Sequence, residues 1–155
     1  MKNTTIIDGK ARAEQLSLQI KEKAAALFDN IGVRPGLAVV VVGENPASQV
    51  YVRNKGKQTV QAGMGSFEHL LSAETSEADL LELVQYLNND PAVNGILVQS
   101  PLPKSIDELA IIELIPQKKD VDGFCAANLG KLVQGSPPHL LPCTPAGVIC
   151  LLDWA

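Results

Sequence analysis

Four polar side chains have types and spacings that suit work on a bound small molecule. Tyr51 and Lys55 are four residues apart, so both would project from one face of a helix. Gln99 follows a short apolar segment, and Asp122 lies in an Asp-Val-Asp-Gly turn. A lysine at the boundary between core and cleft can act as a base or proton shuttle, and a carboxylate can accept paired N–H donors from a heterocycle. The pattern predicts a ligand cleft.

Each of these residues also has a purely structural interpretation, which the spacing alone leaves open. Lys55 can be a solvated lysine at a helix edge, and Gln99 can cap a loop through its amide. Asp120 and Asp122 can form an Asx turn closed by Gly123. Two carboxylates are too few ligands for a calcium loop, and the histidines and cysteines lack the spacing of a zinc site. We therefore expect no metal.

Alternating helical and extended segments must position these side chains. The first of three expected strands is a β-branched run without alternation, typical of a strand buried on both faces of a parallel sheet. The strands are expected over 37–42, 66–71 and 95–98. Helices are expected over 9–29, 46–62 and 106–115, from Ser76 until the Asn88–Pro91 segment, and from Pro145 onward, with Asp8, Asn45 and Ser76 as caps.

Three of the expected helices carry a recognisable apolar face. The face of helix 9–29 is Leu16, Ile20, Ala24 and Leu27. The small and apolar face of helix 46–62 is Val52, Gly56 and Val60, with Gly63 just beyond its end, and that of the helix after Ser76 is Leu80, Leu83, Val84 and Leu87. The alternation predicts an α/β fold with a three-layer, doubly wound, mostly parallel sheet in a single domain. Ligands of such sheets bind beyond the carboxyl ends of the strands, where Lys55 and Gln99 are expected.

The composition is that of a globular domain and argues against several classes of function. The chain has 155 residues, of which 46% are hydrophobic, and a net charge of −4. The lack of any long Lys/Arg run argues against a nucleic-acid partner. Its apolar runs are far shorter than the roughly 20 residues of a membrane helix, and its N-terminus lacks a secretory hydrophobic segment. Three widely spaced cysteines favour reduced thiols in the cytoplasm.

Several spaced motifs together resemble the bifunctional methylenetetrahydrofolate dehydrogenase/methenyltetrahydrofolate cyclohydrolase (FolD) family. The resemblance covers essentially all 155 residues and is carried by the segments 43–63, 93–103, 116–124 and 142–145 and by Asn128, Gly130 and Leu132. It implies oxidation of 5,10-methylenetetrahydrofolate with NADP⁺ and hydrolysis of the methenyl product to 10-formyltetrahydrofolate. It also implies a role in one-carbon metabolism serving purine, methionine and histidine biosynthesis, and a homodimer for the full-length protein.

The resemblance assigns roles residue by residue. Lys55 matches the lysine that is essential for the cyclohydrolase step, and Gln99 matches the residue that hydrogen-bonds to that lysine and tunes it. Tyr51 matches the aromatic residue that stacks on the p-aminobenzoyl ring, and Asp122 matches the carboxylate that holds the pterin. The remaining substrate-binding residues implied are Val98 and Ser100.

The chain departs from the family pattern in two places near the site and at its end. Ser100 stands where the family usually has an apolar residue, and Cys125-Ala126-Ala127 replaces a His-Pro-like stretch. We expect residues 1–122 to form the folate-binding domain. Residues 123–155 would then be a linker and the start of a helix that leads to an NADP-binding domain outside this chain. These 155 residues alone would lack a cofactor site and dehydrogenase activity.

Two other functions stay open at this point. A stand-alone pterin-binding module without catalysis could keep the fold, although a mere scaffold has no need of Tyr51, Lys55, Gln99 and Asp122 together. An amino-acid dehydrogenase with a similar first domain is disfavoured, because its reactive lysine is not expected beside this glutamine and aspartate.

Overall fold

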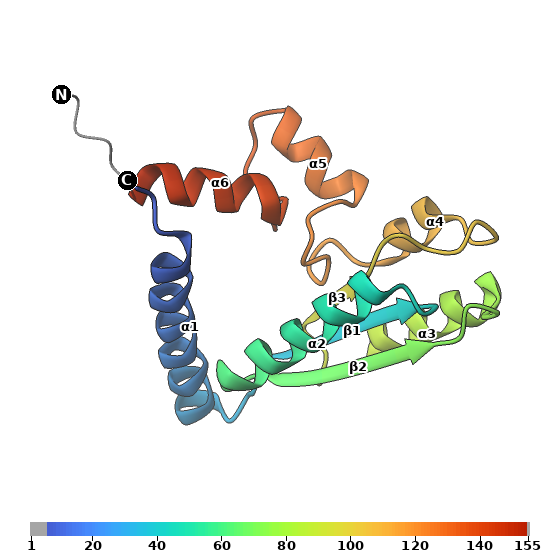
Figure 1. Ribbon diagram of the computed structural model, residues 1–155, viewed down its shortest axis with the longest axis horizontal. Coiled ribbons are helices and arrows are strands. Elements are labelled where there is room, and N and C mark those ends of the chain that lie inside the picture. Colours follow the sequence, from blue (N-terminus) through green and yellow to red (C-terminus); the bar gives the residue numbers. More distant parts are fainter. Residues whose placement is uncertain (1–5, 155) are drawn as a thin grey trace.

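The computed structural model describes residues 6–154 as an α/β fold around a small parallel sheet (Figure 1). Strands β1 (Gly36–Val42), β2 (Gly65–Leu71) and β3 (Gly95–Val98) pair in the order β2-β1-β3. Both pairings of β1 are parallel. The three predicted strands are confirmed, and their carboxyl ends share one edge of the sheet.

Helices join the strands and follow them along the chain. In chain order they are α1 (Gly9–Ile31), α2 (Pro46–Gln61), α3 (Glu77–Asn89), α4 (Glu108–Leu114), α5 (Ala126–Val133) and α6 (Cys143–Trp154). The three predicted caps are confirmed, because the side chains of Asp8, Asn45 and Ser76 accept hydrogen bonds from N–H groups in the first turns of α1, α2 and α3. None of the described helices is long and apolar enough to cross a membrane.

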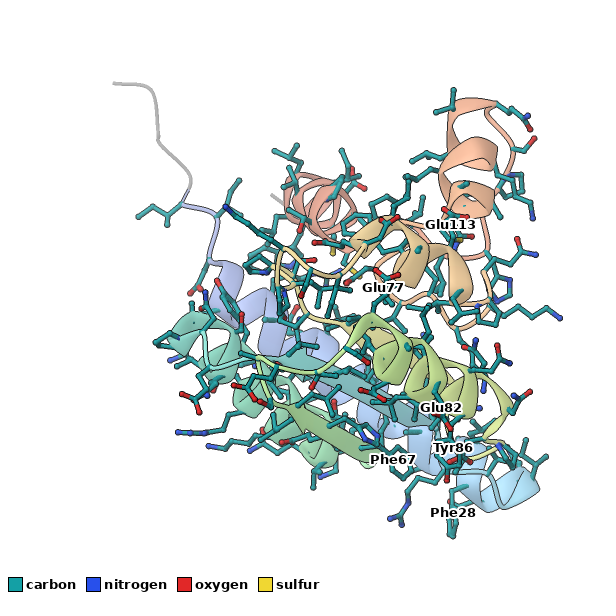
Figure 2. The ribbon with its side chains drawn as sticks, turned by 90° about the vertical axis from the view of Figure 1, so that its right-hand side faces the viewer. Phe28, Phe67, Glu77, Glu82, Tyr86 and Glu113 are labelled. Atoms are coloured by element: carbon teal, nitrogen blue, oxygen red, sulfur yellow. The ribbon has the colours of Figure 1, made fainter. Side chains whose placement is uncertain are left out.

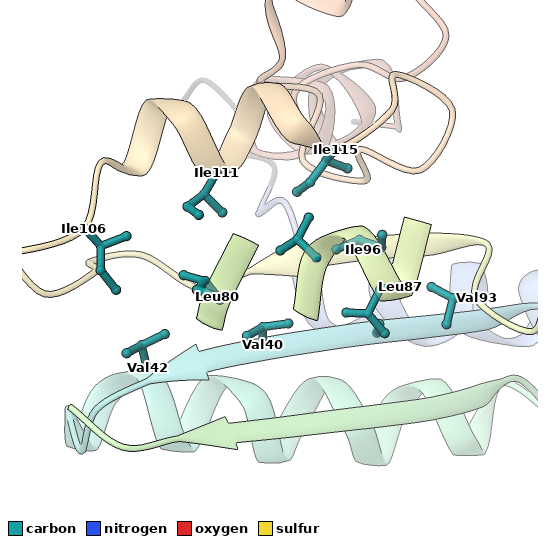
Figure 3. Packing of buried hydrophobic residues seen from close by; sticks show 11 residues of the cluster. Val40, Val42, Leu80, Leu87, Val93, Ile96, Ile106, Ile111 and Ile115 are labelled. Atoms are coloured by element: carbon teal, nitrogen blue, oxygen red, sulfur yellow. The ribbon is translucent and has the colours of Figure 1, made fainter. Parts of the chain in front are cut away.

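Strand β1 is buried on both faces, which explains its unbroken apolar sequence. On one face Val39 and Val41 pack with Val52 of α2. On the other face a larger cluster covers Val40 and Val42, with side chains from α3, α4 and β3 (Figure 3): Leu80, Val84, Leu87, Ile96, Ile106, Ile111 and Ile115. The sheet therefore lies between helices on both sides, as the doubly wound architecture requires.

The inward faces of α1 and α2 differ from the predicted ones. In α2 the buried set is Ser48, Val52, Gly56 and Thr59, whereas Val60 is exposed. The helix approaches β2 closely, since a Cβ on Gly56 would lie 1.8 Å from Glu68 Oε1, and the contact line then passes through Thr59. The predicted stripe of α1 is largely open, with Ala24 buried and Leu16, Ile20 and Leu27 exposed.

The apolar stripe of α1 is exposed because this helix lies beside the sheet instead of covering it (Figure 1). Helix α6 lies beside the first turn of α1, where the Leu151 side chain approaches Gly9, and the end of α2 lies across a hollow from α1. A periodic apolar stripe reports that a helix face avoids water, but it does not say which surface covers that face.

Helix α5 is not among the predicted helices, because the sequence led us to expect a linker in this region. Its N-cap residue, Cys125, makes no side-chain capping bond. The cap comes from another helix, because Glu113 Oε1 of α4 accepts a hydrogen bond from Ala126 N at 2.7 Å (Figure 2). Helix α6 begins at Cys143, earlier than the predicted start at Pro145; a proline is tolerated inside a first turn because its missing N–H has no intrahelical partner there.

The C-terminal end of α3 is capped by a lysine from a distant loop. Lys119 Nζ donates to the carbonyl oxygens of Leu87, Asn88 and Asp90 at 2.9–3.1 Å. These carbonyls belong to the end of a helix, where they lack intrahelical donors. The interaction ties the turn before Asp122 to the opposite edge of the sheet.

We expect Lys119→Met to destabilise the protein by about 1.5–3 kcal/mol, the range for hydrogen bonds to charged groups. Urea unfolding followed by circular dichroism measures the loss. Lys118→Met is the matched control, because it removes an exposed neighbouring ammonium. Equal stability losses in the two variants would contradict a specific capping role for Lys119.

Candidate active site

The shared carboxyl edge of β1 and β3 brings Lys55 and Gln99 together. Lys55 Nζ, on α2, donates to Gln99 Oε1 at 3.0 Å. Gln99 Nε2 donates to the Ser100 carbonyl at 2.9 Å, and Gln99 N donates to the Val40 carbonyl at 2.8 Å. The predicted bond between the two side chains is confirmed. The same amide also bonds to the loop, as the structural interpretation of Gln99 predicts.

The other residues predicted on this edge are open to solvent to different degrees. Tyr51 lies one turn before Lys55 on α2, and 60% of its surface is exposed, which leaves its ring free to stack. Val98 ends β3 and is half-buried. The Ser100 hydroxyl donates to Glu108 Oε1 of α4, so this polar departure from the family pattern has a partner within the fold.

Asp122 lies in a turn that follows α4 and returns to the sheet. Ile96 N donates to the Lys119 carbonyl at 2.7 Å, and Ile96 and Asp120 form a parallel bridge. Gly123 N then donates to the Asp120 carbonyl at 3.2 Å, with Gly123 at φ +69°. Gly123 therefore closes the turn through the backbone, and the predicted Asx turn is wrong, because the Asp120 side chain accepts hydrogen bonds from Cys125 N and the Asn128 amide instead. The turn holds the half-buried Asp122 beside the end of β3.

A small cavity of about 30 Å³ adjoins Asp122. Val98, Ser100 and Phe124 line it together with Asp122, and apolar side chains from β3 and α4 close its base. Two larger hollows, of about 530 and 470 Å³, lie along α1 and include none of Lys55, Gln99 and Asp122. The cavity is far smaller than the roughly 300–1,000 Å³ of drug-sized ligand pockets. Lys55, Gln99 and Asp122 therefore define the candidate site, and a ligand there would lie largely on the exposed surface at the carboxyl edge of the sheet.

The two carboxylates of the turn have opposite electrostatic environments. Burial raises the pKa of Asp122; the Lys55 ammonium opposes this shift, and the charge of Asp120 adds to it. Burial would also raise the pKa of Asp120, but hydrogen bonds from Cys125 N and the Asn128 amide outweigh it and hold that pKa below its ordinary value. The surroundings of Asp120 therefore favour its ionised form, whereas burial of Asp122 favours its protonated form.

No group of three His, Cys, Asp or Glu side chains within residues 6–154 is arranged to hold a metal ion. The two carboxylates of the Asp-Val-Asp-Gly turn also differ in burial and in hydrogen bonding. Both line the small cavity, but Asp120 is buried, 3% exposed, and its Oδ2 accepts hydrogen bonds from Cys125 N and the Asn128 amide, whereas Asp122 is half-buried.

The fold and the edge residues define a class: a doubly wound α/β domain with a lysine–glutamine pair and a half-buried aspartate at the carboxyl edge of its sheet, where such domains bind ligands. The family model for the catalytic domain of tetrahydrofolate dehydrogenase/cyclohydrolase matches residues 7–122. The chain belongs to this family.

Known relatives agree over nearly the whole chain. The bifunctional protein FolD 2 of Roseobacter denitrificans is 57% identical over 148 residues, which are 96% of this chain. The crystal structure of the bifunctional FolD methylenetetrahydrofolate dehydrogenase/cyclohydrolase of Campylobacter jejuni is 43% identical, with a TM-score of 0.94 over 97% of this chain and 53% of that one. A Trypanosoma brucei dehydrogenase–cyclohydrolase, solved with NADP cofactor and inhibitor, is 35% identical, with a TM-score of 0.94 over 99% of this chain and 52% of that one.

The chain spans about half the length of the curated relatives that it matches. The same holds for the solved structures.

Removing the Asp122 charge should stabilise the fold at neutral pH. Because the folded-state pKa of Asp122 is raised, its protonated form favours folding below the unfolded pKa of about 3.9, and this contribution is lost as the pH rises through the folded pKa. We expect Asp122→Asn to unfold at a higher urea concentration than wild type at pH 7, with no difference below about pH 3.5. Asp153→Asn, at an exposed position of α6, controls for net charge. An equal or lower midpoint for Asp122→Asn at pH 7 would contradict the assigned environment.

Gly123→Ala should destabilise the protein by more than the roughly 1–2 kcal/mol cost of a left-handed alanine. A Cβ on Gly123 would also lie 2.6 Å from the backbone carbon of Leu141, so the turn cannot absorb it without moving. Gly130→Ala in α5 is the control: nothing lies within 4 Å of its Cβ, and we expect a gain of up to about 1 kcal/mol. Thermal unfolding of both variants checks the contrast, and a Gly123→Ala midpoint at or above wild type would refute it.

Proposed function

We propose that this chain forms the folate-binding and catalytic half of an enzyme that oxidises 5,10-methylenetetrahydrofolate and hydrolyses 5,10-methenyltetrahydrofolate to 10-formyltetrahydrofolate. The observation that carries the proposal is the 3.0 Å hydrogen bond from Lys55 Nζ to Gln99 Oε1, on the same edge as Asp122. The family and the names of the relatives support the same chemistry.

Lys55 is the proposed proton carrier of the hydrolysis. The methenyl carbon is part of a cationic amidinium and is already electrophilic, so water needs orientation and a place for its proton. As water adds to that carbon, it releases one proton to solvent. The bond from carbon to the pterin nitrogen then breaks as the Lys55 ammonium gives a proton to that nitrogen, and Lys55 takes up the hydroxyl proton as the formyl carbonyl forms.

Gln99 prepares Lys55 for this exchange. Its Oε1 occupies one direction around Nζ, and its Nε2 is held by the Ser100 carbonyl, so the amide cannot rotate without losing a bond. The geometry leaves the other directions of Nζ for water and substrate. Lys55, Gln99 and Tyr51 are the proposed catalytic residues.

Asp122 and Tyr51 are the proposed contacts to the two ends of the folate. The half-buried Asp122 carboxylate would accept N–H donors of the pterin, and the exposed Tyr51 ring would stack on the p-aminobenzoyl group. Val98 and Ser100 line the cavity next to Asp122 and complete the proposed substrate contacts. In this proposal residues 1–122 form the folate-binding domain and residues 123–155 lead away from it.

NADP is the proposed cofactor, held outside these 155 residues. The Gly63-Met64-Gly65 segment precedes β2, at the amino edge of the sheet, so it cannot direct a helix N-terminus at a pyrophosphate as a dinucleotide loop does. The residues here do not fit the cofactor, and their part in the oxidation is to hold the folate. Three free cysteines support a cytoplasmic location, and by family resemblance the full-length protein is proposed to be a homodimer.

Lys55→Met should lower the turnover of methenyltetrahydrofolate by about 10²–10⁴-fold, the usual contribution of a positioned acid–base group. The change keeps the apolar stem and removes the amine. Lys57→Met, two residues along α2 and exposed, is the matched control and should keep wild-type turnover. Gln99→Ala should lower the same activity and alter its pH–rate profile. The measurement is the absorbance decay of methenyltetrahydrofolate with the full-length protein.

Wild-type turnover by a folded Lys55→Met variant would overturn the catalytic assignment. Folate binding by the wild-type protein without any turnover would favour the alternative of a pterin-binding module. These two results are separable, because binding is measured by calorimetry and turnover by absorbance.

A further inference from the structure

Asn128 is a polar side chain with no exposed surface, and it connects three segments of the chain. Its Nδ2 donates to Asp120 Oδ2 at 3.0 Å and to the Gln117 carbonyl at 3.1 Å. Its Oδ1 accepts from His139 N at 3.1 Å and Leu140 N at 3.4 Å. Both ends of the amide are therefore engaged, and the amide can neither flip nor move without leaving buried groups unpaired.

Asp120 is the partner of Asn128 and stands two residues before Asp122. Its Oδ2 also accepts from Cys125 N at 2.9 Å, and its backbone bridges to Ile96 of β3. Asp120 thus joins the turn to the sheet through its backbone and to α5 through its carboxylate. Both donors to this carboxylate, the Cys125 backbone N–H and the Asn128 amide, are neutral, so a neutral acceptor of the same shape would satisfy them without the desolvation cost of a buried charge.

A second bond fixes the same turn from the other side. Cys143 Sγ, at the first residue of α6, donates to the Val121 carbonyl at 3.0 Å. Asp122 is thus flanked by a residue tied to α5 and by a carbonyl tied to α6. Gly123, packed against the backbone of Leu141 and Pro142, allows this close approach.

We propose that Asp120 and Asn128 form a positioning pair, which holds the Asp122 carboxylate at the substrate edge by tying its turn to β3, α5 and the segment before α6. The pair does not touch the substrate and acts through Asp122. This inference rests on the proposed function insofar as Asp122 binds folate, but the position and charge environment of Asp122 can be tested without substrate.

The charge of Asp120 is part of this arrangement. The charged and titratable groups around Asp122 are Asp120 in the same turn, Lys55 on α2 and Cys143 on α6. Asp120 favours the protonated form of Asp122 and Lys55 favours the ionised form. Asp120→Asn keeps an acceptor for the Asn128 amide and Cys125 N but removes the negative charge that acts on Asp122. The variant therefore tests the charge of Asp120 separately from its hydrogen bonds.

The experiment uses three variants of the full-length protein: Asp120→Asn, Asn128→Asp and the double exchange. Binding of tetrahydrofolate, which lacks the reacting carbon, is measured by calorimetry. The titration of Asp122 is followed by ¹³C NMR of its carboxyl carbon, assigned as the signal lost in Asp122→Asn. Asn88→Asp is the matched control, because Asn88 is a half-buried amide whose Nδ2 bonds to the Leu114 carbonyl at the other edge of the sheet.

We expect Asn128→Asp to weaken tetrahydrofolate binding by about tenfold or more, because two facing carboxylates push the turn apart. The double exchange removes the two facing carboxylates and should recover part of the affinity, although the Gln117 carbonyl still lacks the donor that Asn128 supplied. Asp120→Asn should lower the pKa of Asp122 with little loss of affinity. Asn88→Asp should lower the unfolding temperature without changing the affinity.

Wild-type affinity in a folded Asn128→Asp variant, with a stability loss like that of Asn88→Asp, would overturn the proposal and leave the pair a fold-stabilising contact. If Asn128→Asp does not fold, the double exchange and Asp120→Asn decide: failure of the double exchange to bind, or an unchanged Asp122 titration in Asp120→Asn, overturns it. If wild type itself does not bind tetrahydrofolate, the proposed function fails, and the Asp122 titration still tests the pair.

Discussion

The burial of β1 on both faces is the constraint on which the rest of the structure depends. Its side chains from Ala38 to Val42 are all apolar and all buried, so the strand needs a layer on each side. Helix α2 covers one face, and α3 and α4 cover the other. Parallel crossovers then bring the carboxyl ends of β1 and β3 to one edge, and the polar residues that follow those strands meet there.

The polar groups at this edge are arranged by burial and by charge together. Lys55 is held by a neutral amide, while its charge opposes the effect of burial on Asp122. The pKa values of the two aspartates of the turn are shifted in opposite directions, because hydrogen bonds to the Asp120 carboxylate outweigh its burial, whereas burial dominates at Asp122. Pairs of acidic groups with diverging environments are typical of sites that bind or transform a ligand.

Long-range polar ties hold the loops that carry this edge. Lys119 caps α3, Glu113 caps α5 and Asn128 joins the turn to the segment before α6. Each bond links residues that are more than ten positions apart in the sequence, as Lys119 is linked to Leu87. Because buried donors and acceptors without partners are costly, such ties fix the loop positions as strictly as the core fixes the strands.

Local signals in the sequence determined much of this protein. Apolar runs placed the three strands, the caps Asp8, Asn45 and Ser76 placed the starts of three helices, and helical spacing put Tyr51 and Lys55 on one face. These features depend on residues within a few positions of one another, so the chain carries them before it folds.

Only the tertiary structure decided the features that depend on distant partners. Helix α5 begins where Glu113 supplies its cap, the buried face of α2 runs through Thr59 because Gly56 meets β2, and α1 keeps an open stripe beside α6. The bond between Lys55 and Gln99 was foreseen as one alternative, whereas the pairing of Asp120 with Asn128 was not foreseen at all. Hydrogen bonds across the fold leave no periodic pattern in the sequence, because their partners are brought together by the packing of the sheet and not by spacing along the chain.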